Sequence, residues 1–231
     1  MKNVFTFLLL LFSLLCNGQS PKLFTTDKEL SSSLINQIYQ DRNGFIWIAT
    51  EDGLNRYDGA KFTIYKHEPN NEHSLAHNFV RTVFEDSKGH LLIGTYIGIQ
   101  MYDPATDNFT PLAKLEDTGE TLESNINSFI ERKNGEIWVS GNVLCKLDIK
   151  DHLLTVRKVD IAVTSPGSLF EDKKQNVWMA KGEEGVYQLT PDNQLTLHLS
   201  KDNGYVKSIC EDQRGNIYVC LLYTSDAADD K

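Results

Sequence analysis

The stretch "NGFIWIATEDGLNRYDG", residues 43–59, has the form of a strand, a tight turn and a second strand. Related stretches follow it along the chain, so we searched for a period before interpreting any single motif. Five copies are present, and they span residues 38–58, 83–103, 129–148, 169–189 and 209–220. A recurrence of this kind indicates a repeat architecture rather than one hairpin in an irregular domain.

The copies align on a turn residue, with intervals of 45, 46, 40 and 40 residues between Gly44, Gly89, Gly135, Gln175 and Gly215. The position three residues later is large and mostly aromatic, and it holds Trp47, Leu92, Trp138, Trp178 and Tyr218. The position three residues earlier is acidic in four of the five copies, and it holds Asp41, Asp86, Arg132, Asp172 and Asp212. We interpret these positions as structural markers of the repeat.

Each copy predicts four strands. The first carries spaced apolar residues, and the second is almost wholly apolar, as in residues 45–49, which indicates that both of its faces are buried. The third alternates apolar and polar residues, as in 54–57, and a variable fourth fits 61–65, 108–112, 153–156 and 194–197. Four strands in 40 to 46 residues is the period of a propeller blade. The chain is therefore predicted to be all-β, a β-propeller with about four and a half four-stranded blades.

The aromatic repeat position is expected to pack between neighbouring blades rather than to bind a ligand. The unbroken apolar run of the second strand supports this, because stacked blades cover both faces of each other's middle strands. The predicted blades lie near residues 33–72, 78–115, 124–160, 165–200 and 204–220, within a propeller segment of residues 19–220.

The pattern I-x-x-D-x-x-G-x-I-W-I-G-T-x-x-G-L-x-R-Y-D resembles the two-component regulator propeller repeat. The stretch 70–95, with its Ser74-Leu75 entry, is especially similar, and the resemblance covers about residues 30–220. The third copy departs from the pattern with Arg132 for Asp and no Gly before Leu144, and the fourth copy departs with Gln175 for Gly and Pro166 in its predicted first strand. We interpret these departures as loop variation.

The resemblance implies the periplasmic sensor region of a hybrid two-component sensor histidine kinase. It implies a larger, seven-bladed ring, a later membrane helix and kinase, and a homodimer at full length. It also implies an oligosaccharide ligand, whose contact residues are unknown. No kinase residue maps onto this chain, so we regard the chain as an N-terminal fragment without catalytic residues of its own and expect no cofactor.

Two other classes of function stay open. One is a stand-alone exported propeller that acts as a glycan-binding or scaffold module. The other is a polysaccharide lyase or glycosidase, which would need a carboxylate or His/Tyr cluster contributed by several blades around the central channel.

The N-terminal residues 1–18 are interpreted as a signal peptide. Lys2 precedes the apolar run 4–15, which is too short to span a bilayer. A lipoprotein acylated on Cys16 is the alternative, but Leu15 occupies a position that usually holds a small residue; a buried N-terminal helix is the third interpretation. Export predicts a periplasmic location.

The C-terminal residues 221–231 do not follow the repeat. They break the fifth copy within its second strand and end in an acidic run. We interpret this tail as translated sequencing adapter, with a genuine frayed C-terminus as the alternative.

The net charge of −9 and the pI of about 5.1 argue against a nucleic-acid partner or binding to an anionic membrane. The mature chain would keep three cysteines, Cys145, Cys210 and Cys220. Their odd number and their spacing fit no disulfide framework or metal pattern. We interpret all three as small hydrophobic residues, and Cys210 falls on a core position of the repeat.

Three clusters resemble functional sites. Residues 41–44 resemble a calcium loop, but the other copies carry lysines there, so a hairpin turn is expected. His67, His73 and His77 invite a zinc interpretation, but they match no zinc spacing and lie in a polar loop. The acidic pairs 85–86, 171–172 and 211–212 recur once per copy, so we expect them to bind backbone N–H groups at the turns rather than to form a catalytic pair. No metal site is predicted.

Overall fold

The computed structural model describes residues 23–26, 29–182, 184–200 and 205–222. The predicted signal peptide and residues 223–231 of the predicted tail lie outside the described residues. The described part of the chain contains strands and no helix. No segment of it therefore qualifies as a helix that could cross a membrane.

The strands form five separate sheets, and apart from β9 in the third sheet each sheet is built from consecutive antiparallel strands. The strands of the first two sheets are β1 (Ile35–Gln40), β2 (Ile46–Thr50), β3 (Gly53–Tyr57), β4 (Phe62–Tyr65), β5 (Val80–Glu85), β6 (Leu91–Thr95), β7 (Ile99–Asp103) and β8 (Asn108–Phe109). The third sheet contains β9 (Lys114–Leu115), β10 (Ser128–Glu131), β11 (Ile137–Ser140), β12 (Leu144–Lys150) and β13 (Leu153–Lys158). The last two contain β14 (Leu169–Glu171), β15 (Val177–Lys181), β16 (Gly185–Leu189), β17 (Leu195–Ser200), β18 (Tyr205–Glu211) and β19 (Ile217–Leu222).

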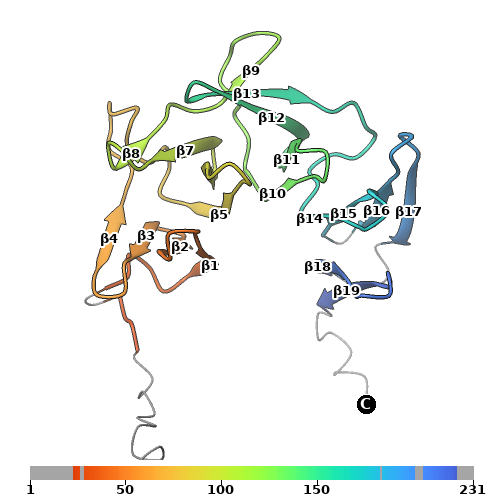
Figure 1. The fold of residues 1–231 in the computed structure, drawn as a ribbon, viewed down its shortest axis with the longest axis horizontal. Coiled ribbons are helices and arrows are strands. Elements are labelled where there is room, and N and C mark those ends of the chain that lie inside the picture. Colours follow the sequence, from red (N-terminus) through yellow and green to blue (C-terminus); the bar gives the residue numbers. More distant parts are fainter. Residues whose placement is uncertain (1–22, 27–28, 183, 201–204, 223–231) are drawn as a thin grey trace, which may run out of the picture.

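The sheets stand side by side in an open arc, with β1, β5, β10, β14 and β18 along its concave side (Figure 1). The fourth strands β4, β8, β13 and β17 lie toward the outside. The β18–β19 hairpin is half of a fifth blade. The prediction of an all-β propeller with about four and a half blades is confirmed.

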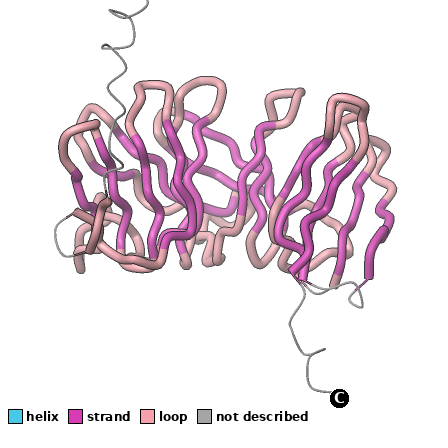
Figure 2. Tube along the Cα trace, turned by 90° about the horizontal axis from the view of Figure 1, so that it is seen from below, coloured by secondary structure: helices cyan, strands magenta, loops and turns pink. Residues whose placement is uncertain are grey.

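The strands run between two ends that carry all the connections (Figure 2). Because neighbouring strands are antiparallel, all the turns from first to second strand lie at one end, which we call the turn face. The turns from second to third strand and the connections between blades lie at the other end, which we call the loop face. The repeat glycines belong to the turn face.

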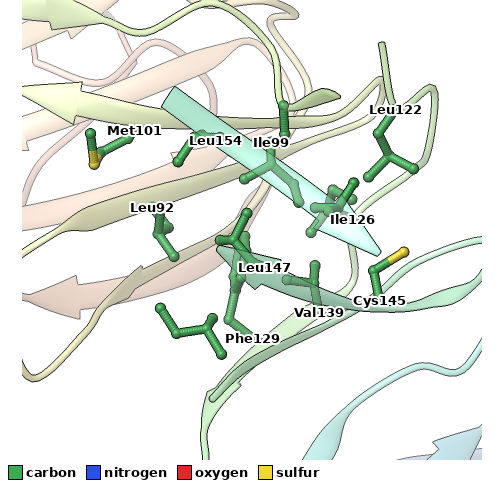
Figure 3. Packing of buried hydrophobic residues seen from close by; sticks show 13 residues of the cluster. Leu92, Ile99, Met101, Leu122, Ile126, Phe129, Val139, Cys145, Leu147 and Leu154 are labelled. Atoms are coloured by element: carbon green, nitrogen blue, oxygen red, sulfur yellow. The ribbon is translucent and has the colours of Figure 1, made fainter. Parts of the chain in front are cut away.

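The core lies between neighbouring sheets rather than within one. Trp47 is 1% exposed and packs with Val80, Val83 and Ile93 of the next sheet. Leu92 occupies the same position one blade on and packs in a cluster that holds Phe129, Val139 and Leu147 (Figure 3). Trp138 and Trp178 continue the series against the fourth and fifth sheets. The large repeat residue is thus the main inter-blade packing residue.

The two ends of the arc expose the faces that are buried elsewhere. Ile38 is 61% exposed, whereas the residues at its position in the inner blades are buried: Val83, Phe129 and Leu169. At the other end Tyr218 is 55% exposed, although it stands at the position of Trp47. Each end sheet therefore exposes an apolar face. In the inner sheets, the equivalent face is covered by the neighbouring sheet.

The cysteines differ from one another. Cys145 is buried, and burial raises the pKa of its thiol to about 11. Cys210 and Cys220 are exposed, on the same face of the last hairpin as Tyr218. The interpretation as buried hydrophobic residues therefore holds for Cys145 and is wrong for the other two. The reason is that the core position of Cys210 faces a neighbouring sheet, and none covers it among the described residues.

This difference predicts selective labelling. A maleimide reagent is expected to modify Cys210 and Cys220 in the folded chain and to spare Cys145, because a buried thiol with a raised pKa offers little thiolate. Peptide mapping by mass spectrometry reads each site separately, and labelling in urea serves as the control. Fast modification of Cys145 under native conditions would contradict the buried position.

The third strands alternate apolar and polar residues, but the polar residues are not all exposed to solvent. Asn55 and Gln100 are fully buried. The Gln100 side chain accepts a hydrogen bond from the Ala76 N–H and donates to the carbonyls of Ser74 and Thr110. Gln100 thus ties the connection between the first two blades to the sheet. Asn55 ties the segment before β1 to its sheet, because it accepts the Ser31 N–H and donates to the Ser31 hydroxyl. These bonds satisfy the buried amides.

Three local details also differ from the sequence-based expectations. Pro166 precedes β14 instead of lying in it, because proline has no N–H for the sheet. The third sheet gains β9, a short strand that pairs in parallel with β13. Strand β19 continues two residues past position 220, since Leu221 packs against the core while Leu222 pairs with Tyr205.

Candidate ligand-binding face

The repeat glycines serve the tight turns of the turn face. Gly44, Gly89, Gly135 and Gly215 have φ between +83° and +95°, a region that favours glycine. Gln175 adopts φ +67° at the same position, so the fourth copy keeps the turn with a residue that is less suited to it.

The repeat aspartates close these turns. In the first copy Asp41 Oδ1 accepts hydrogen bonds from the N–H groups of Asn43 and Phe45, both at 3.0 Å. Its Oδ2 accepts the indole N–H of Trp47 at 2.8 Å. Equivalent backbone bonds are made by Asp86, Asp172 and Asp212. The carboxylate therefore links the turn to the inter-blade packing residue.

The third copy lacks this aspartate and uses other groups. Trp138 donates its indole N–H to Glu136 at 3.0 Å, and Asn134 accepts the Glu136 N–H. The Arg132 guanidinium lies 4.6 Å from the centre of the Trp138 ring. A hydrogen bond from Lys146 is the main reason why the pKa of Glu136 falls to about 2.

A second carboxylate per blade joins neighbouring blades. Glu85, Glu131, Glu171 and Glu211 each accept a backbone N–H from the turn of the preceding blade, at 2.6 to 3.0 Å. The donors are Arg42, Ser87, Lys133 and Lys173. The acidic pairs are thus split, since each Asp serves its own turn and each Glu the turn before it. Both carboxylates of each pair therefore have a structural role.

A polar cluster between the first two blades joins Arg56 and Tyr102, which stand at R-Y-D positions of the repeat pattern, to Tyr65 and Asp107. The hydroxyls of Tyr65 and Tyr102 donate to Asp107 Oδ1 at 2.6 Å, and Arg56 donates to the same atom at 2.8 Å and to the Tyr102 hydroxyl. Burial raises the pKa of both tyrosines. Burial opposes ionisation of Asp107, but these donors outweigh it and lower its pKa. The four groups are therefore bound to one another.

The three histidines of the polar loop, where no metal site is predicted, form separate contacts. His67 Nδ1 lies 2.9 Å from the Leu75 carbonyl, His73 Nδ1 lies 3.1 Å from the Phe109 carbonyl, and His77 Nδ1 accepts the Phe79 N–H. In the part of the chain that the structure describes, no group of three His, Cys, Asp or Glu side chains could hold a metal ion.

The loop face carries an exposed aromatic platform. Tyr96, in the turn between β6 and β7, is 53% exposed. Its ring lies 5.5 Å from that of His77 and 6.1 Å from that of Phe79, and its N–H donates to the Phe79 carbonyl. The platform therefore combines a turn with the connection that precedes the second blade.

A cavity of about 680 Å³ opens beside Tyr96, and we call it the amide cavity. It is lined by Ile97, Leu112, Thr121, Glu123, Ser124, Asn125 and Asn142. The Asn125 Oδ1 atom is buried and has no hydrogen-bond partner among the described residues. The cavity thus joins an apolar wall, an aromatic edge and amide groups, which is the composition of a small-molecule site. Sequence analysis named none of these residues, because each lies outside the repeated positions.

Comparison with known proteins identifies the repeat. The model of the "two component regulator propeller" family matches residues 29–52 and 74–96. Histidine kinase P4 of Formosa agariphila is 37% identical over 83 residues, which are 33% of this chain and 6% of that protein. The chain is a β-propeller by its fold. The two matched segments fall at the first and second repeats, which are similar to the two-component regulator propeller repeat.

Solved structures share the fold. The extracellular domain assigned to the hybrid two-component system BT4673 of B. thetaiotaomicron superposes with a TM-score of 0.70 and 18% identity, over 88% of this chain and 31% of that chain. Virginiamycin B lyase of Staphylococcus aureus superposes with a TM-score of 0.61 and 14% identity, over 89% of this chain and 74% of that one. At these identities the likeness shows the propeller fold alone. The chain spans less than a third of the sensor domain and a small part of the kinase.

Proposed function

We propose that this chain is the extracytoplasmic, ligand-sensing propeller of a hybrid two-component sensor histidine kinase and that it responds to carbohydrate fragments. The supporting observation is the exposed Tyr96 platform next to Asn125, whose buried Oδ1 atom has no hydrogen-bond partner among the described residues. An aromatic ring offers a flat apolar surface with a polar edge, which suits a sugar ring. An amide both donates and accepts hydrogen bonds, as sugar hydroxyls do.

The platform predicts the effect of one substitution. Tyr96→Ala is expected to weaken binding of the recognised oligosaccharide about tenfold or more, because an anchoring tyrosine typically contributes that much. An array of neutral and acidic oligosaccharides identifies the ligand, and titration calorimetry measures the affinity of the full chain. Tyr218→Ala is the matched control, since Tyr218 is equally exposed but lies on the last hairpin. Equal loss in both variants, or binding unaffected by Tyr96→Ala, would contradict this site.

The proposal extends to the whole protein. We infer that further blades cover the exposed apolar faces at Ile38 and Tyr218, and that a membrane helix and a kinase belong to the same protein, which acts as a periplasmic homodimer. The matched kinase and sensor domain support this, because both are much longer than the chain. Sequencing the genomic locus beyond the codon for Lys231 tests it. A reading frame without further blades or a kinase would refute the sensor and favour an exported glycan-binding or scaffold module.

A lyase or glycosidase receives less support. The recurrent carboxylates of the turn face are bound to backbone N–H groups, and they lie at the opposite end of the strands from the amide cavity. Hydrolysis or cleavage of the bound oligosaccharide by the purified chain would revive this alternative.

A further inference from the structure

A second cavity, of about 530 Å³, lies beside the amide cavity, and we call it the extension cavity. Both cavities are lined by Ile97, Leu112 and Thr121. Thr121 is exposed and the other two are partly exposed, so solvent reaches the surface that separates the two cavities. A ligand longer than one cavity can therefore lie across these three residues and occupy both.

The connection between the second and third blades forms much of this surface. It runs over residues 110–127 and is longer than the connections at 66–79 and 159–168. Its shape is fixed, because β9 pairs with β13 and Lys114 forms a bridge with Thr121. Long connections on a rigid scaffold often carry binding sites. The extra length of this connection supplies a wall that both cavities share.

The third blade adds a further wall to the extension cavity. The two-residue turn between β12 and β13 holds Asp151 at φ +49° and His152 at φ +63°. Such turns favour Asn-Gly or Asp-Gly, because glycine adopts positive φ without strain. His152 and the next residue, Leu153, line the extension cavity, and Leu153 is 55% exposed. The turn thus holds a histidine where glycine would fit better, which is a feature of binding sites.

The polar groups of the extension cavity suit hydroxyl groups. His67 Nδ1 lies 2.9 Å from the Leu75 carbonyl, so Nδ1 carries a proton, and in the neutral ring Nε2 is an acceptor. None of the salt bridges among the described residues involves Lys114, whose ammonium is a donor. The exposed Glu72 carboxylate is a second acceptor. Donors and acceptors beside an apolar wall match a sugar unit, which has apolar faces and a hydroxyl edge.

We infer that the ligand is an oligosaccharide of more than one unit, which runs from Tyr96 and the amide cavity across Leu112 into the extension cavity. Its first unit lies on Tyr96, and Lys114 and Leu153 contact its later units. The site therefore distinguishes oligosaccharides from the monosaccharide by the contacts in the extension cavity. This inference rests on the proposed function, because it extends the same site.

Titration calorimetry of the full chain tests the inference with the mono-, di-, tri- and tetrasaccharide of the glycan that the array identifies. The trisaccharide is expected to bind about tenfold or more tightly than the monosaccharide, since hydrogen bonds to a charged group such as Lys114 contribute that much. Lys114→Ala should remove most of this gain and leave the monosaccharide unchanged. Lys150→Ala is the matched control, because Lys150 is also exposed but lies outside both cavities.

Leu153→Ser tests the apolar wall in the same way, with Leu197→Ser as its control, since Leu197 is 48% exposed and lies outside both cavities. Equal affinity for one and three units, unaffected by Lys114→Ala and Leu153→Ser, would overturn the inference and leave saccharide binding at Tyr96 standing. Equal weakening of one and three units by Lys114→Ala would also overturn it, because the first unit would then lie in the extension cavity. Absence of binding by every saccharide of the array would refute the proposed function and the inference with it.

Discussion

Replacing Trp47 with alanine is expected to lower the free energy of unfolding by about 3 to 5 kcal/mol, the range for large aromatic residues in a core. Trp47 is almost fully buried between the first two blades, and its ring lies 5.9 Å from that of Tyr65 and 4.9 Å from that of Tyr102. The substitution leaves a cavity there and removes the indole donor from Asp41. Urea unfolding followed by circular dichroism measures the loss.

The chain contains its own control for this prediction. Tyr218 occupies the same repeat position but is 55% exposed, so Tyr218→Ala is expected to change the free energy of unfolding by only about 0.5 kcal/mol. If both variants lost the same stability, the repeat position would act within its own hairpin, and packing between blades would not be the reason for its size.

Asp172→Ala is expected to lower the free energy of unfolding by more than about 3 kcal/mol. The buried carboxylate accepts the N–H groups of Lys174 and Asn176 through Oδ1, and the side chains of Asn176 and Trp178 through Oδ2, at 2.8 to 2.9 Å. The substitution leaves these four donors without their acceptor, and each buried unsatisfied donor costs about 1 to 3 kcal/mol. Urea unfolding of the variant measures the loss.

Asp212→Ala is the matched control, because Asp212 makes equivalent bonds in an exposed hairpin where water can replace them. Its effect is expected to be much smaller. Equal losses in the two variants would show that the hydrogen bonds matter and the burial does not.

The same residue predicts a pH dependence. Burial opposes ionisation of Asp172, but hydrogen bonds from Trp178 and Asn176 outweigh it and lower its pKa below the ordinary value of 3.8. The stabilisation is therefore present above pH 3.8 and is lost as the pH falls through the lower pKa of the folded state. As the pH falls through this range, the free energies of unfolding of the wild type and of Asp172→Ala should converge. A constant gap between them would contradict the assignment.

The parts that sequence predicted well are those that repeat locally. Each turn has a residue that tolerates positive φ and an aspartate that accepts hydrogen bonds from N–H groups two and four residues later. A large residue follows on the next strand. These requirements recur from blade to blade, with Arg132 and Gln175 as exceptions, so Asp41, Gly44 and Trp47 could be recognised with their equivalents. The period of 40 to 46 residues then led to four-stranded blades, and the structure shows them.

The candidate site could not be predicted in this way. Tyr96 and Asn125 stand at positions that differ in every copy, and the hydrogen bond from Arg81 to Asn127 joins residues 46 positions apart. The bond between Glu85 and the Arg42 N–H likewise joins two blades. A local sequence pattern does not predict such pairs, because each partner fits the turn or strand of its own blade whether or not the other is present.

Sequence by itself determined the blade, its turns and its packing residue, since these follow from hydrogen bonds and side-chain preferences within about twenty residues of chain. Only the tertiary structure decided which copies of one position are buried, as Trp47 is, and which are exposed, as Tyr218 is. It also brought basic side chains from three blades, Arg81, Lys181 and Lys207, to one cavity of an acidic chain. Burial and local charge depend on which blades stand side by side, and that arrangement exists only once the strands have folded together.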